Sequence, residues 1–335
     1  MITRILKKAN LHFRPGKLHF GPEWIVLGVN NLCNMHCKMC DVGVGYDGSN
    51  FYHNLMAARP LNMPIDLIKR IFDETATYFP QAKIGYAFTE PIIYPHLLES
   101  LAYANEKGLY TSMTTNALKL RKMASELAEA GLNDIFISLD GPQDIHNEIR
   151  GNKNSFQWAV EGIKKILALP GKRPQISVYC TITEWNIGHL LPFVEFFKDI
   201  PLAQMGFMHT NYTPQNLADR HNAIYGGQYP ATASNMEEID LDAMNLDLLW
   251  QEMEAIRSRE WPFEIVFSPE LPDKAALKRF YLQPEEILGK VCNDAFRTLM
   301  VKSDGSVIPA HGRCYNLTVG NIYKDNLKEI WNAPL

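Results

Sequence analysis

The chain has 335 residues, of which 46% are apolar and 21% are charged, and its formal net charge is −4. This composition predicts a large buried core and excludes a strongly basic protein that binds nucleic acid through its overall charge. No stretch approaches the roughly 18 apolar residues of a transmembrane helix, and the N-terminus lacks the apolar core of a signal peptide. We therefore expect a cytoplasmic protein with no membrane span and no nucleic-acid partner.

Short apolar runs alternate with helical patterns as far as residue 208. The runs are β-branched or aromatic and nearly continuous, as in strands that helices cover on both faces. Strands are predicted at residues 24–29, 84–88, 109–114, 134–139, 175–181 and 203–208. Helices are predicted at residues 65–78, 97–105, 118–130, 156–167 and 186–197. This order predicts a parallel sheet with right-handed crossovers, whose chemistry lies at the carboxyl ends of the strands.

The alternation stops after Met208. Residues 209–240 are rich in Asn, Tyr, Gly and Pro, and they precede a helical pattern at 241–257 and a strand-like run at 263–267. From Cys292 onward the sequence changes to short β-segments. We expect a barrel-forming part, a substrate-facing insertion with a helical connector, and a small C-terminal module. Their predicted bounds are 1–208, 209–290 and 291–335.

Three of the six cysteines lie within eight residues, directly after the first predicted strand. Cys33, Cys37 and Cys40 have the spacing C-x3-C-x2-C, and thiolates are soft ligands that suit iron–sulfur clusters and zinc. Three thiolates can bind three irons of a cubane cluster and leave the fourth iron open to a reactant. Two alternatives stay open: ordinary buried cysteines, or a zinc site in which His36 is an awkwardly placed fourth ligand.

The next two predicted strands both end in polar residues. Thr89 and Glu90 follow the second strand, where a carboxylate and a carbonyl oxygen can accept hydrogen bonds from an ammonium group. Taken alone, Thr-Glu-Pro is also a common helix entry. Asn116 follows the third strand, where it either orders the mouth of the barrel or caps the next helix.

The fourth predicted strand ends in Ser138-Leu139-Asp140-Gly141, and Arg150 follows ten residues after the aspartate. A lone Asp or Arg in a loop is usually a solvated surface group. Here, however, the segment follows the cysteine triplet and the two polar strand ends along the chain. This ordered series resembles the radical S-adenosylmethionine (SAM) superfamily. The resemblance is to the branch that includes peptide maturases and sugar-alcohol dehydrogenases.

The resemblance implies a partial (β/α)6 parallel barrel and a [4Fe-4S] cluster bound by Cys33, Cys37 and Cys40. SAM would chelate the unligated iron. An external one-electron reductant such as flavodoxin or ferredoxin would drive cleavage of SAM to methionine and a 5′-deoxyadenosyl radical. That radical would abstract hydrogen from the substrate.

The resemblance also implies contacts to SAM. Thr89 and Glu90 would hold the methionine ammonium, although two glycines of the family pattern are replaced by Phe88 and Thr89. Arg150 would pair with the methionine carboxylate, for which an arginine fork is well suited. Met39, at a position that is often aromatic in the family, would give apolar cover near the adenine.

Three further roles follow from the same resemblance. Ser138 would hydrogen-bond the ribose, Asn116 would order the barrel mouth, and Asp140 would contact ribose or substrate. Asp140 and Arg150 are therefore the catalytic candidates. The substrate pocket is expected between the loop 41–63, Asp140 and the segment 208–229. Its candidate polar contacts are Tyr46, His209, Asn211 and Tyr212.

The C-terminal module resembles the start of a SPASM or twitch domain, which carries auxiliary clusters in related enzymes. The family pattern expects a cysteine at position 310, but Ala310 stands there, and no cysteine follows Cys314. Cys292 and Cys314 remain, with His311 as a third donor. Either this branch does without the auxiliary cluster or the chain is cut short; we expect no complete auxiliary cluster.

Three functions are consistent with these patterns. The first is a radical enzyme that oxidises, epimerises or rearranges a small polar metabolite of the sugar or aminocyclitol type, because no peptide-binding domain is recognisable before the first strand. The second is a radical maturase of a ribosomally made peptide, which the Ser-Leu-Asp-Gly segment and the SPASM-like module fit. The third is a non-catalytic module that retains a metal site.

The expected lack of a complete auxiliary site can be measured directly. We predict that the anaerobically reconstituted protein holds about four irons per chain, the content of one cubane cluster. Iron and sulfide quantitation that returned about eight irons per chain would contradict this prediction, because it would require a second cubane cluster.

Overall fold

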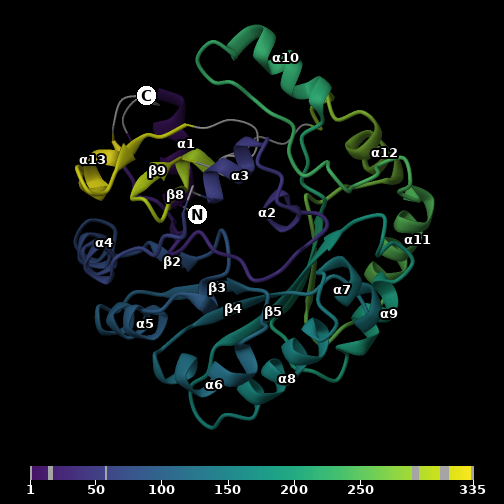
Figure 1. The fold of residues 1–335 in the computed structure, drawn as a ribbon, viewed down its shortest axis with the longest axis horizontal. Helices are drawn as coiled ribbons and strands as arrows, with labels where there is room; N and C mark the ends of the chain where they lie inside the picture. The colour runs from purple at the N-terminus through teal and green to yellow at the C-terminus, as the bar shows by residue number, and fades with distance from the viewer. Residues whose placement is uncertain (1, 14–17, 57–58, 289–293, 310–316, 333–335) are drawn as a thin grey trace.

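The computed structural model describes residues 2–13, 18–56, 59–288, 294–309 and 317–332. Within these residues all the strands form a single sheet (Figure 1). The strands are β1 (Trp24–Leu27), β2 (Lys83–Tyr86), β3 (Thr111–Thr115), β4 (Asp134–Ser138), β5 (Gln175–Ile182), β6 (Gln204–His209), β7 (Glu264–Ser268), β8 (Thr298–Val301), β9 (Ser306–Ile308) and β10 (Gly320–Asn321). Their order across the sheet is β10-β9-β8-β1-β2-β3-β4-β5-β6-β7.

The strands from β1 to β7 are all parallel to their neighbours, which confirms the predicted parallel α/β fold. The strand-like run at 263–267 is β7, which extends the parallel sheet beyond the six predicted strands. On the other side, β8 pairs in parallel with β1, and β9 and β10 continue in antiparallel fashion. Both ends of the predicted barrel are therefore extended by strands from the last quarter of the chain.

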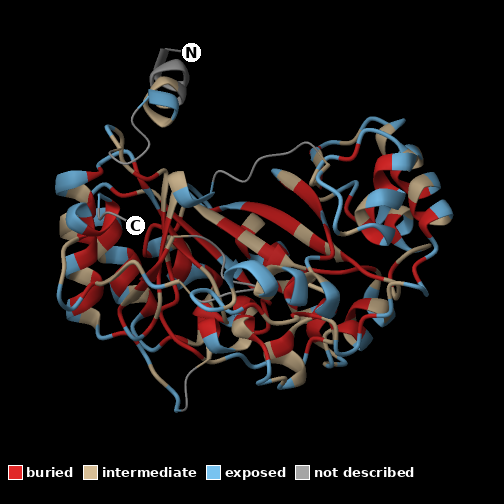
Figure 2. Ribbon diagram, turned by 90° about the horizontal axis from the view of Figure 1, so that it is seen from above, coloured by how far each residue is buried: buried red, intermediate tan, exposed pale blue. Residues whose placement is uncertain are grey.

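Helices cover the outer face of this sheet in an arc (Figure 1). They are α4 (Ile65–Tyr78), α5 (Leu97–Glu106), α6 (Leu120–Glu129), α8 (Ser155–Leu167), α9 (Leu190–Phe196) and α11 (Leu246–Arg257). Each presents an apolar stripe inward: in α4 the buried residues include Leu67, Ile68, Ile71 and Phe72, at the spacing of one helix face. Figure 2 shows the result, a buried sheet with exposed residues on the surrounding helices.

The other helices surround the carboxyl ends of the strands or lie near the termini. They are α1 (Ile2–Phe13), α2 (Asp41–Val44), α3 (Asn50–Leu55), α7 (Gln143–Ile149), α10 (Gln215–Tyr225), α12 (Lys274–Leu282) and α13 (Leu327–Trp331), with 3-10 turns at Pro91–Ile93 and Asp294–Phe296. No helix of the described residues is long and apolar enough to cross a membrane.

The C-terminal segment packs against the start of the chain. The Trp331 indole N–H donates to the Phe20 carbonyl oxygen at 2.6 Å, and the Leu327 N–H donates to the Glu74 carboxylate at 2.7 Å. Because β7 pairs with β6 and β8 pairs with β1, the barrel-forming part, the insertion with its connector and the C-terminal module all contribute strands to one sheet. The exact bounds of these three parts stay a prediction. Cys292, Ala310, His311 and Cys314 lie outside the described residues, so the auxiliary site also stays a prediction.

Candidate active site

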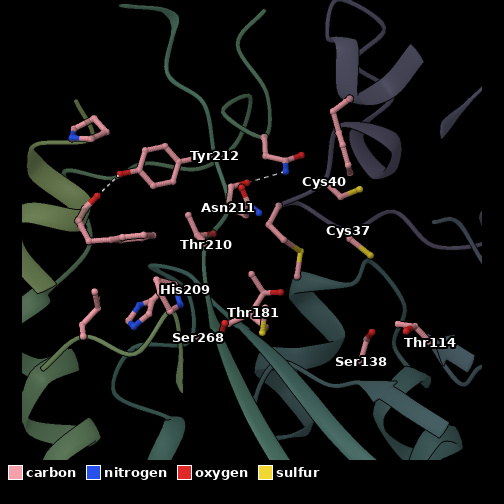
Figure 3. A pocket seen from close by; sticks show the side chains of 18 of the residues that line it. Cys37, Cys40, Thr114, Ser138, Thr181, His209, Thr210, Asn211, Tyr212 and Ser268 are labelled. Atoms are coloured by element: carbon pink, nitrogen blue, oxygen red, sulfur yellow. Dashed lines mark hydrogen bonds between the residues drawn. The ribbon is translucent and has the colours of Figure 1, made fainter. Parts of the chain in front are cut away.

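A large cavity lies at the carboxyl ends of the parallel strands, where the sequence predicts the chemistry (Figure 3). Its volume is about 820 Å³, within the range of pockets that enclose small ligands. The predicted cluster and cofactor residues meet here from five separate segments of the chain. Those that line the cavity are Cys33, Cys37, Met39, Cys40, Thr89, Glu90, Asn116, Ser138 and Arg150.

The cysteine loop joins β1 to α2 and is held by its own backbone. Cys37 is buried, Cys40 is partly buried and Cys33 is exposed. Gly43 permits the tight path of the loop, because a Cβ atom there would lie 2.4 Å from the carbonyl oxygen of Cys37. The Lys38 N–H donates to the carbonyl oxygen of Ile149 at 2.9 Å, which ties the loop to the end of α7.

The thiols of Cys33 and Cys37 are poor acids in their surroundings. Burial raises the pKa of the Cys37 thiol to about 12, and it also raises the pKa of Cys33. Such a thiol keeps its proton at neutral pH unless a metal replaces it, which fits the soft irons of a cluster. In the part of the chain that the structure describes, no three His, Cys, Asp or Glu side chains are arranged to hold a single metal ion.

Glu90 lies just after β2 and is almost completely buried. Its carboxylate accepts hydrogen bonds from the Thr115 hydroxyl at 2.7 Å and from the backbone N–H groups of Asn116 and Ile92 at 2.7 and 3.1 Å. Burial outweighs these bonds and raises the pKa of Glu90 to about 7. A cation beside a buried carboxylate stabilises its ionised form, and an ammonium group would be such a cation.

Asn116 connects the third strand to the cysteine loop. Its Nδ2 donates to Oδ1 of Asn34, which lies between the first two cysteines, at 2.7 Å. Its Oδ1 accepts the N–H of Leu118 at 3.1 Å, which closes a local turn. The alternative that Asn116 caps the next helix is wrong, because the N-cap of α6 is Lys119. Asn116 is thus bonded to the loop that carries the cysteines, a position that fits the expected ordering of the barrel mouth, and that role stays a prediction.

Two strand ends hold side chains in a backbone conformation that favours glycine. Phe88 has φ of 78° and Ala117 has φ of 61°, both in the left-handed region. A residue with a side chain adopts this conformation at a cost of about 1–2 kcal/mol. Phe88 stands where the family pattern described above has a glycine, so this turn keeps a glycine-like path although the glycine is replaced.

The remaining predicted contacts lie along the same wall. The Thr89 hydroxyl donates to the carbonyl oxygen of Asn30 at 2.9 Å, and Ser138 extends from the end of β4 toward the cavity (Figure 3). Met39 is buried in a small apolar cluster with Met35 and Ile149. These positions fit the expected contacts to ammonium, ribose and adenine, and those contacts stay predictions.

Asp140 and Arg150 form a buried ion pair behind this wall. The Arg150 Nε donates to one Asp140 oxygen, and the other oxygen accepts the Thr181 N–H at 2.9 Å. Arg150 Nη1 lies 3.5 Å from the Cys37 sulfur. Burial alone would lower the pKa of Arg150, but the Asp140 carboxylate raises it above its usual range. The guanidinium therefore stays charged.

The position of Asp140 corrects its expected role. It is fully buried and is not among the residues that line the cavity, whereas Arg150 is. The expected contact of Asp140 with ribose or substrate therefore has no support in this geometry. Its carboxylate is already occupied by Arg150 and Thr181, which makes Asp140 a residue that positions Arg150.

The opposite wall of the cavity is the part that the sequence identified least. His209, Asn211 and Tyr212 line it, as expected, but Tyr46 does not. Most of this wall comes from residues 268–288, which follow β7 and include α12. Nothing in the motif pattern marks this segment, and only the pairing of β7 with β6 brings it to the cavity.

The two walls are joined through Asp41 and Asn235. The Asp41 N–H donates to the Asn235 side-chain oxygen at 3.1 Å, and the Asn235 N–H donates to the Asp41 carboxylate at 2.8 Å. Asn235 Nδ2 also donates to the carbonyl oxygen of Asn211 at 3.0 Å. The residue next to Cys40 is thus bonded to the segment that faces the substrate.

Comparison with known families decides what kind of site this is. The sequence model of the radical SAM superfamily matches residues 28–197, which is half of the chain. The chain belongs to the radical SAM superfamily. A second model, the SPASM iron–sulfur cluster-binding domain, matches residues 292–335. The resemblance drawn from the motifs is therefore confirmed, and so are the [4Fe-4S] cluster and SAM as cofactors of this radical SAM enzyme.

Individual relatives of the enzyme are distant. Fe-coproporphyrin III synthase from Methanosarcina barkeri is 23% identical over 199 residues, 59% of this chain and 46% of that protein. PqqA peptide cyclase from Bradyrhizobium diazoefficiens is 24% identical over 203 residues, 59% of this chain and 49% of that protein. A probable GTP 3′,8-cyclase from Methanococcus maripaludis is 26% identical over 237 residues, 67% of this chain and 74% of that protein. The matches to the first two span less than half of those relatives.

A solved structure shares the fold over nearly the whole chain. Streptococcus suis SuiB bound to S-adenosylmethionine superposes with a TM-score of 0.65 and 16% sequence identity. The match covers 99% of this chain and 70% of that chain. At this identity the likeness establishes the radical SAM fold with its C-terminal extension.

The raised pKa of Glu90 predicts a pH-dependent stability in the cluster-free protein. The folded-state pKa of about 7 exceeds the ordinary value of 4.5, so the folded state holds the proton more tightly. The wild type should lose up to about 3 kcal/mol relative to Glu90→Gln as the pH rises from about 4.5 to 7. Urea unfolding of both proteins at pH 5 and pH 8 measures this; a difference that does not change with pH would contradict the burial argument.

Proposed function

We propose that this radical SAM enzyme is a maturase that abstracts hydrogen from a residue of a ribosomally made peptide. The observation that carries the proposal is the chemistry of the wall opposite the cysteines. This wall is largely apolar, and its charged side chains are Glu270, Arg279 and Glu286. Its apolar members are Leu217, Pro269, Leu271, Pro272, Ala276, Phe280, Pro284, Ile287 and Leu288.

The scarcity of positive charge argues against strongly anionic substrates. Among the described residues that line the cavity, Arg150 and Arg279 are the only arginine or lysine side chains. Arg150 lies on the wall of the cysteines, 3.5 Å from the Cys37 sulfur, where it is expected to bind the carboxylate of SAM. A nucleoside triphosphate or a nucleotide-linked sugar needs several cationic groups to replace the water around its phosphates. A neutral peptide segment needs none.

The polar groups of this wall suit amides. His209 lies at the end of β6 with its Nδ1 3.0 Å from the Tyr281 hydroxyl. Burial lowers the pKa of His209 to about 4, so the imidazole is neutral at physiological pH. Neutral imidazole, together with the side chain of Asn211, can exchange hydrogen bonds with a peptide backbone without adding a charge.

Two relatives act on or bind peptides according to their names, which also supports the proposal. One is the PqqA peptide cyclase described above, and SuiB has been solved with its precursor peptide SuiA. The small polar metabolite that the sequence first suggested has less support, because a sugar or aminocyclitol would leave the apolar wall without contacts. The peptide reading uses both the apolar and the polar groups.

The residues of the wall that carries the cysteines then serve the cofactor. Bound at the cluster, SAM supplies on one-electron reduction the radical that removes a hydrogen atom from the substrate. Thr89 and Glu90 bind the ammonium group of SAM, and Ser138 binds its ribose. Arg150 binds the carboxylate of SAM, held in place by Asp140. The one-electron reductant is an external flavodoxin or ferredoxin.

The proposal is tested by supplying candidate peptides. Synthetic peptides encoded by short reading frames beside the gene are incubated anaerobically with the reconstituted enzyme, SAM and dithionite. We expect 5′-deoxyadenosine formation to rise several-fold with at least one peptide, together with a mass change in that peptide. Sugars and aminocyclitols serve as the comparison set. Stimulation by a member of that set, with no peptide modified, would contradict the proposal.

A further inference from the structure

We propose that the outer edge of β7 binds an extended stretch of the peptide substrate as an additional strand and thereby presents alternate residues to the cavity. This inference rests on the proposed function and adds a docking surface to it. Among the residues that the structure describes, β7 is the last strand of the sheet on its side, and its far edge carries main-chain groups without a neighbouring strand there.

The direction of these groups follows from the pairing with β6. The Glu264 N–H donates to the carbonyl oxygen of Ala203, so the main-chain groups of Glu264 point toward β6. The main-chain groups of successive residues in a strand point alternately to its two sides. The N–H and carbonyl groups of Ile265 and Phe267 therefore point away from β6, toward the outer edge of the sheet. In the part of the chain that the structure describes, no strand or loop pairs with them there. They offer two N–H donors and two carbonyl acceptors to an incoming strand.

A small hollow beside this edge provides room for a side chain. Its volume is about 260 Å³, below the range of pockets that enclose a whole drug-sized ligand. Its walls come from one face of β7, the end of α11 and the loop that follows, and they combine apolar side chains with the charged groups of Arg257, Arg259 and Glu270. The lining residues are Ile256, Arg257, Arg259, Trp261, Phe263, Ile265, Phe267 and Glu270.

The hollow and the reaction cavity lie on opposite faces of β7 and meet at its end. Ile265 and Phe267 line the hollow, whereas Ser268 lines the cavity. Glu270 lines both and is held by Arg257 through a contact of 2.5 Å. A strand paired with β7 would place alternate side chains in the hollow and toward the cavity. This is how added strands gain affinity from the backbone and specificity from side-chain pockets.

The position of the edge favours a peptide over a second copy of the enzyme. The chain after β7, residues 268–272, lines the reaction cavity directly. A second protein packed along β7 would cover this part of the cavity and exclude a substrate. A single extended segment pairs with the same groups and delivers its next residues to the radical. The occupant is therefore an unfolded, largely neutral stretch of peptide.

The first test measures amide hydrogen exchange in the reconstituted enzyme at single-residue resolution. Without peptide, the amides of Ile265 and Phe267 should exchange much faster than those of Glu264 and Val266. The synthetic peptide that the enzyme modifies should slow both edge amides at least tenfold. Protection of the edge in the free enzyme, or protection that grows with enzyme concentration, would overturn the proposal, because the chain itself or a second copy would then occupy the edge.

The second test removes the hydrogen bonds from each side. Ile265→Pro deletes one outward N–H where proline is tolerated, and Ile265→Val is the matched control that keeps it. We expect the KM of the proline variant for the peptide to be about tenfold above that of the valine variant, with little difference in kcat, because the two differ in the N–H that the peptide would use. Peptides N-methylated at alternate amides test the same bonds with unaltered enzyme, should the proline variant fail to fold.

The outcomes separate the two proposals. Turnover of a peptide by the wild type, with equal KM for the proline variant and no protection of β7, would overturn the docking surface alone. If the wild type modifies none of the peptides, the proposed function fails, and the occupant assigned to this edge fails with it.

Discussion

The buried ion pair between Asp140 and Arg150 is the interaction on which the cofactor half of the site depends. A carboxylate without solvent exposure must be paired, because an uncompensated charge in the protein interior costs several kcal/mol. Here the pair joins four elements: the end of β4, the end of α7, the backbone of β5 and the cysteine loop. The guanidinium is therefore fixed in direction before any ligand arrives.

The two walls of the cavity differ in how they are built. The cofactor wall takes one or two polar residues from each successive strand end and fixes them with backbone hydrogen bonds, as Glu90 illustrates. The opposite wall comes from β6, β7, α12 and the segments beside them, and it is largely apolar, with Arg279 as its one arginine or lysine side chain among the described residues. This division suits an enzyme family that keeps one cofactor chemistry and varies its substrates, since only the second wall must change.

The sequence predicted the parallel sheet and the cofactor wall well, because both leave local signals. The helix at 65–78 matches α4 at both ends, since its apolar stripe is strictly periodic. Cys33, Glu90 and Arg150 were found because their motifs fall in order at strand ends. Asp140 was assigned to the wrong neighbour, because burial and ion pairing depend on contacts between distant segments. The wall at 268–288 escaped notice for the same reason: it has no motif, and only the register of β7 places it.

The central claim is that Asp140 positions Arg150 for SAM, and its most direct test is Asp140→Asn. The account predicts that this variant still assembles its cluster, but that the Kd for SAM, measured by titrating the EPR signal of the reduced cluster, rises about tenfold or more. The exposed neighbour Asp144→Asn is the control and should bind SAM as the wild type does. An unchanged Kd and an unchanged EPR signal in Asp140→Asn would contradict the account.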